Sequence, residues 1–122
     1  MNERSVQRSI LKMMGKCFPP MFVAHVPNGA HLGGGRQARA RQMGALKGDG
    51  LKVGFPDLVC LWNGKAYFME VKNSEGGKLS DVQKETLERL EGMGFPVAVV
   101  TSDKEAFDFL KANAAPWSGL EL

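Results

Sequence analysis

Three charged residues stand inside an otherwise apolar stretch near the middle of the chain. Asp57 begins one apolar run, and Glu70 and Lys72 end the next. The Asn63-Gly64 pair between the runs is the one that two-residue type I′ turns prefer, so the pattern predicts an antiparallel hairpin. Alternate residues of a strand share a face, about 7 Å apart, and the start of one strand lies beside the end of its partner. Two carboxylates and an ammonium group are therefore expected to converge.

The charges of this cluster indicate its chemistry. Two carboxylates a few ångströms apart repel each other and need a cation, and hard oxygen ligands favour Mg²⁺ or Mn²⁺. Lys72 would hold a water or hydroxide in line with a phosphorus atom, which would give metal-dependent hydrolysis of a phosphodiester. The alternative is structural: Asp57 caps a turn after Pro56, and Glu70 and Lys72 form an ion pair on an exposed strand.

Composition places this cluster in a small globular protein. The 122 residues, 43% of them hydrophobic, fit one domain over residues 1–122. No apolar run approaches the ~20 residues that span a bilayer, and no signal-peptide pattern is visible. Cys17 and Cys60 match no metal-ligand spacing, and Cys60 falls in a predicted buried strand. These features predict a reduced intracellular protein.

Charge is distributed unevenly along the chain. Residues 1–56 hold nine Lys and Arg against two acids, a net charge of +7, whereas residues 57–122 have a net charge of −4. Arg36, Arg39 and Arg41 fall around the start of a predicted helix, where cations oppose the helix dipole and bound phosphate would compensate them. The asymmetry indicates a basic surface for a polyanion, unless it is only uneven solvated charge.

The remaining pattern predicts the elements around the hairpin. Helices are expected over residues 2–16, 37–47, 80–93 and 102–112, the last two beginning with the capping boxes Ser80–Gln83 and Ser102–Glu105. Strands are expected over residues 21–26 and 95–100, the second buried on both faces, and Met43 and Leu46 are expected to point inward. The order α-β-α-β-β-α-β-α predicts an α/β fold with a mixed central sheet of about four strands flanked by helices.

The motif set resembles a known nuclease superfamily. Pro56-Asp57, followed thirteen residues later by Glu70-x-Lys72, is similar to the PD-(D/E)XK motif. The fuller set resembles its VRR-NUC branch: Gly54-x-Pro56-Asp57-Leu58, Glu70-Val71-Lys72, Leu79-Ser80-x-x-Gln83-Lys84, Asn28-Gly29-Ala30 and the basic segment before Gly54. The resemblance extends to about Thr101 and implies a restriction-endonuclease-like core. It is to the stand-alone form of phages and bacteria, which implies the cytoplasm of a bacterial cell or phage-infected host.

The resemblance also implies individual roles. Asp57, Glu70 and the backbone carbonyl of Val71 would bind the divalent metal, Lys72 would position the attacking water, and Gln83 would face the site. Gln83 has a second interpretation, because it also occupies the N3 position of a capping box.

Four further polar residues keep two interpretations each. Glu3 either matches an acidic residue near the metal or lies on solvated helix surface. His25 and His31 are either general bases or packing and loop residues. Asn28 either contacts phosphate or shapes the glycine-rich loop.

Together these features predict a Mg²⁺-dependent DNA endonuclease, with Mn²⁺ able to substitute. The residues expected to hold DNA phosphates are Asn28, Arg36, Arg39, Arg41 and Lys47. No sequence-reading motif is visible, so selectivity for branched DNA or Holliday junctions in replication, recombination or repair is expected. Symmetric cutting of a junction by a one-site domain would require a homodimer. The alternatives are a restriction or end-trimming nuclease and a catalytically silent DNA-binding module.

Overall fold

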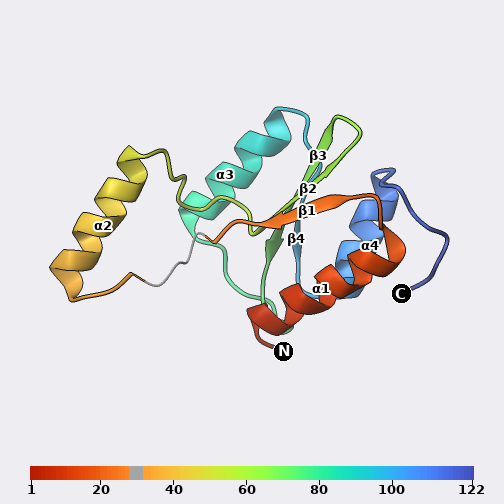
Figure 1. Ribbon diagram of the computed structural model, residues 1–122, viewed down its shortest axis with the longest axis horizontal. Coiled ribbons are helices and arrows are strands. Elements are labelled where there is room, and N and C mark those ends of the chain that lie inside the picture. The colour runs from red at the N-terminus through yellow and green to blue at the C-terminus, as the bar shows by residue number, and fades with distance from the viewer. Residues whose placement is uncertain (28–31) are drawn as a thin grey trace.

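The computed structural model describes residues 1–27 and 32–122 and shows a four-stranded sheet with helices on both faces (Figure 1). In chain order the elements are α1 (Glu3–Cys17), β1 (Phe22–His25), α2 (Arg36–Gly48), β2 (Leu58–Trp62), β3 (Lys65–Val71), α3 (Asp81–Gly92), β4 (Val97–Val100) and α4 (Asp103–Ala112). The predicted element order and the mixed α/β class are confirmed.

The central hairpin has the turn and register that its sequence predicts. Asn63 and Gly64 both have positive φ angles, 49° and 77°, as a type I′ turn requires. Strands β2 and β3 pair antiparallel with Leu58 opposite Met69, which places Asp57 beside Glu70. Strand order is β1-β2-β3-β4, and β4 pairs with β3 in parallel.

The two faces of the sheet differ in what they contact. One face packs on α1 and α4, which lie side by side in Figure 1, and the buried residues there form the main core. Tyr67, Met69 and Val71 of β3 belong to this core. The intervening residues point to the other face, on the side of α3, where Phe68 meets the ring of Phe55 in an edge-on contact. Glu70 therefore shares the α3 face with Phe68.

Two expectations about burial are wrong. Strand β4 lies at an edge of the sheet, and Val99 is 41% exposed rather than buried on both faces. Met43 and Leu46 do not reach a core either: they are only half-buried, and α2 contains no buried residue. Figure 1 shows α2 standing apart from the sheet, beyond α3.

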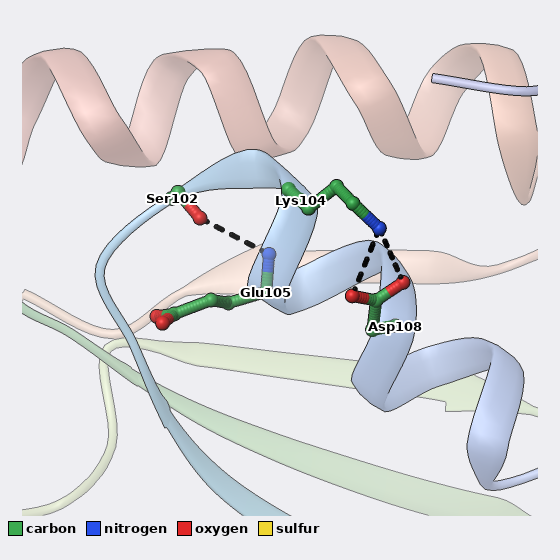
Figure 2. A network of polar contacts seen from close by, with 4 residues as sticks. All are labelled: Ser102, Lys104, Glu105 and Asp108. Atoms are coloured by element: carbon green, nitrogen blue, oxygen red, sulfur yellow. Dashed lines mark hydrogen bonds and ion pairs between the residues drawn. The ribbon is translucent and has the colours of Figure 1, made fainter.

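The start of α4 differs from the predicted capping box (Figure 2). Ser102 Oγ accepts a hydrogen bond from the Glu105 backbone N–H at 3.1 Å, which is half of the motif. The Glu105 carboxylate accepts instead from the N–H and hydroxyl of Thr101, at 2.6 and 2.8 Å. The reciprocal bond to the cap is therefore missing, and an exposed ion pair between Lys104 and Asp108 follows one turn later.

Both cysteines are buried free thiols, and burial raises the pKa of Cys60 to about 12. The raised pKa keeps the Cys60 thiol protonated, and it is the thiolate that binds metals and acts as a nucleophile. In the part of the chain that the structure describes, no helix is long and apolar enough to cross a membrane.

Candidate active site

Asp57 is held where three strands meet. Its Oδ2 atom accepts a hydrogen bond from the Val71 backbone N–H at 2.8 Å, which ties the residue before β2 to the last residue of β3. Its backbone carbonyl accepts from the Val26 N–H at 2.8 Å and lies 3.1 Å from the Nδ1 atom of the exposed His25 ring. The backbone at Asp57 is thus fixed from β1, and its carboxylate from β3.

Glu70 is a buried carboxylate that is only half satisfied. It is 3% exposed; Oε1 accepts from Gln83 Nε2 at 3.1 Å, and the buried Oε2 has no hydrogen-bond partner. Burial raises the pKa of Glu70 to about 8, and the negative charge of nearby Asp57 raises it further; Lys72 opposes the shift, and Glu3 adds to it. Because the ionised form is disfavoured, a cation beside Oε2 would stabilise it.

Lys72 is also buried, at 8% exposed. Its Nζ atom donates to Gln83 Oε1 at 3.3 Å. Across the described residues no ion pair joins Lys72 to Glu70. The structural alternative, an ion pair between Glu70 and Lys72 on an exposed strand, is therefore wrong: the two side chains are buried, and they do not form an ion pair.

Gln83 combines the two roles that its sequence position left open. Its backbone N–H and Ser80 complete the capping box of α3, in which Gln83 Oε1 accepts from the Ser80 N–H at 2.9 Å. The same oxygen accepts from Lys72, and the amide nitrogen donates to Glu70. The first turn of α3 thus fixes the side chains of Glu70, in β3, and of Lys72, directly after it.

Two glycines that the sequence analysis did not place in the site hold it together. A Cβ at Gly54, whose φ is 81°, would lie 2.9 Å from Val82 Cγ1 and 3.0 Å from the Gln83 backbone N. A Cβ at Gly77 would lie 2.9 Å from Lys72 Cδ. The signal for Gly54 was its place two residues before Pro56 in the Gly54-x-Pro56-Asp57 motif. Nothing local marked Gly77, because it approaches Lys72 only in the folded chain.

The donor set fits a hard divalent cation. Among the described residues, no three His, Cys, Asp or Glu side chains gather into a metal-binding group, so Asp57 and Glu70 would need the Val71 carbonyl or water to complete a shell. Mg²⁺ is commonly bound in this way, by one or two carboxylates and several waters. The unpartnered Oε2 of Glu70 and its raised pKa are the observations that suit such an ion.

The remaining predicted residues are Glu3, the cations of α2, Asn28 and His31. Glu3 is exposed at the start of α1, yet its charge acts on Glu70. The cations expected to bind DNA stand on the separate helix α2, all exposed: Arg36, Arg39, Arg41 and Lys47. Asn28 and His31 lie outside the described residues. A hollow of about 420 Å³ lies at the start of α3, lined by Lys78, Leu79, Ser80, Asp81 and Gln83.

Comparison with known proteins agrees with this fold. The sequence matches the family model described as VRR-NUC domain over residues 4–104. A solved structure described as a VRR_NUC domain protein is similar with a TM-score of 0.71 and 17% sequence identity, covering 95% of this chain and 90% of that chain. No curated protein matches the sequence. Because the family model covers most of the chain, the protein belongs to the VRR-NUC domain family, a family of nucleases, which implies DNA as its substrate.

Proposed function

We propose that the protein is a Mg²⁺-dependent DNA endonuclease whose active site is Asp57, Glu70, Lys72 and Gln83, with Mn²⁺ able to replace Mg²⁺. The observation that carries the proposal is the buried, unpartnered oxygen of Glu70 beside Asp57. A carboxylate in this state is unfavourable in the protein alone and favourable once a cation is bound. Asp57, Glu70 and the Val71 carbonyl would hold that ion.

The roles of the chain's own groups follow from their contacts. A bound divalent cation would polarise the phosphate and stabilise the charge that develops on it. Asp57 keeps its orientation through the Val71 N–H, and Gln83 orients both Glu70 and Lys72. The methylene stem of Lys72 passes close to Gly77, and its ammonium group donates to Gln83. That ammonium group would position the attacking water and offset negative charge in the transition state.

DNA would be held mainly through its phosphates. Helix α2 begins at Arg36 after the N-cap residue Gly35, which supplies no side-chain cap, and its first turn holds no acid but carries Arg36 and Arg39. Free N–H groups and arginines at a helix start suit a phosphate oxygen. Arg41 and Lys47, further along the helix, would extend this contact, and Asn28 belongs to the same proposal.

Selectivity would then depend on DNA shape. We include in the proposal a preference for branched DNA or Holliday junctions, as in replication, recombination or repair, and a homodimer that places two sites on one junction. The support is that phosphate contacts carry no sequence information directly, together with the two-fold symmetry that paired incisions need.

A panel of DNA substrates tests this function. Plain duplex, flapped duplex and four-way junction DNA of matched length are incubated with the protein in Mg²⁺, in Mn²⁺ and in EDTA, while the mass in solution gives the oligomeric state. We expect metal-dependent incision, fastest on branched DNA, by a particle of two chains. Equal cutting of plain duplex would instead indicate a restriction or end-trimming nuclease, and binding without any cutting would indicate a silent DNA-binding module.

A further inference from the structure

A groove of about 600 Å³ runs between α3 and the segment that leads from α2 to β2. Its walls are largely apolar, and several of the side chains that form them are strongly exposed for their type: Val53, Val82 and Met93. Exposed apolar side chains that gather around one depression indicate a binding surface. The groove lining does not include Asp57, Glu70, Lys72 or Gln83.

The charged residues that line the groove are all cations. Lys47, Lys52 and Arg89 line it, and no Asp or Glu does. Within residues 1–27 and 32–122 none of these three cations forms an ion pair. An apolar groove that also carries three cations without ion-pair partners is complementary to a ligand with flat apolar groups on an anionic backbone, which is the chemistry of an unpaired nucleic acid strand.

Two residues that line the groove are close in sequence to residues of the candidate active site. Phe55, which lines the groove, lies two residues before Asp57, and Val82 directly precedes Gln83. The close contact of Gly54 with Val82 and Gln83 joins these two segments into one layer. A strand lying in the groove would therefore continue toward the carboxylates.

We propose that this groove binds the unpaired strand of a branched DNA substrate, with bases on the Val53–Val82–Met93 surface and phosphates on Lys47, Lys52 and Arg89. The proposal rests on the nuclease function proposed above and specifies its substrate: a duplex next to a single-stranded arm. A second copy of the chain fits less well, because a two-fold contact through this groove would bring its own three cations together. An intact duplex fits less well, because its bases are stacked inward.

The experiment compares binding of two DNAs to the metal-free protein in EDTA, where cleavage cannot occur. One is a fluorescein-labelled fork with an unpaired arm, and the other is a fully paired duplex of the same length; both are titrated at one salt concentration and followed by fluorescence anisotropy. Met93→Asp places a carboxylate in the apolar lining of the groove and should weaken fork binding about tenfold more than duplex binding. Leu120→Asp, at a residue of similar exposure in the C-terminal tail, is the matched control and should change neither.

A second variant keeps the test valid even if Met93→Asp disturbs the local structure at the end of α3. Lys52→Gln should remove about one phosphate contact and so reduce the slope of log binding constant against log salt concentration for the fork by about one. Thermal unfolding of each variant shows whether it is folded. If both variants weaken fork and duplex equally, or weaken neither, the groove does not hold an unpaired strand.

The groove proposal and the nuclease proposal can be contradicted independently of each other. Fork-selective loss in Met93→Asp, with no cleavage of any DNA by the wild-type protein in Mg²⁺, would uphold the groove and contradict the nuclease. Metal-dependent cleavage with equal fork preference in wild type and Met93→Asp would uphold the nuclease and contradict the groove.

Discussion

Gln83 shows how one side chain serves both the fold and the site. Its amide completes a helix cap through Ser80 and at the same time bonds Glu70 and Lys72. Helix caps contribute about 1 kcal/mol to stability. Ordering Lys72 through the same group means that the lysine is held in place before any substrate binds, which is what a positioned water requires.

The pH dependence of metal-free stability should report Glu70 directly. Its folded pKa of about 8 lies above the ordinary value of 4.5, so its stabilising contribution is complete below pH 4.5 and is lost as the pH rises toward 8. The difference in Tm between Glu70→Gln and wild type in EDTA should therefore move by at least a few degrees in favour of the variant from pH 5 to pH 8.5.

Thermal melts of the two proteins across this range provide the measurement, since other titrations cancel in the difference. Mg²⁺ should raise the Tm of wild type at pH 8.5 and leave Glu70→Gln almost unchanged. A difference that stays constant with pH would contradict the buried, proton-binding state of Glu70.

The sequence predicted which residues come together, Asp57, Glu70 and Lys72, better than it predicted how buried they are. The period of the strand placed Glu70 and Lys72 on one face, and the turn placed Asp57 beside them. The burial of both charges and the missing Glu70–Lys72 ion pair depend on α3 and on the segment at Gly77, which approach β3 only in the folded chain. Spacing within one hairpin carries no information about such neighbours.

Among the elements, the contact between Gly54 and α3 is the one that places the helix. Gly54→Ala should reduce the free energy of unfolding by about 1–2 kcal/mol for its positive φ alone and by roughly 1–3 kcal/mol more for the Cβ that would press on Val82 and Gln83. Its cleavage rate should also fall, because Gln83 moves. Urea unfolding and a cleavage assay measure the two effects.

The matched control is Gly64→Ala in the hairpin turn. Gly64 has a similar φ of 77° but nothing within 4 Å of a Cβ, so only the conformational penalty applies. Equal destabilisation by the two substitutions would show that the contact with α3 is not tight.

The elements that the sequence predicted well were those with local signals. The Asn63-Gly64 turn and the Ser80 cap each depend on a few adjacent residues, and both formed as expected. The burial of β4 was predicted wrongly because an apolar run does not reveal whether its strand is central or at an edge. Helix α2 formed, but its apolar residues found no sheet to cover.

Over the whole molecule, the basic helix α2 stands apart from a compact body that carries the carboxylates (Figure 1). Replacing Arg36, Arg39 and Arg41 together with Gln should weaken binding to every DNA sequence alike and reduce the salt slope by about one per arginine. Stability should change by less than about 0.5 kcal/mol, because α2 buries no residue.

Salt titrations of binding to several unrelated duplexes test this expectation. Replacing Arg4, Arg8 and Lys12 of α1, a basic row of the same size, gives the comparison. A change in sequence preference after the α2 substitutions would show that these arginines contact bases.

The central claim is that Asp57, Glu70 and Lys72 form a metal-dependent nuclease site, and paired cleavage and binding assays test it most directly. Asp57→Ala and Lys72→Ala are compared with wild type on branched DNA in Mg²⁺, with binding measured in EDTA and folding by thermal melts. We expect both variants to lose cleavage by at least about 100-fold while remaining folded and still binding DNA. Cleavage at the wild-type rate by either folded variant would contradict it.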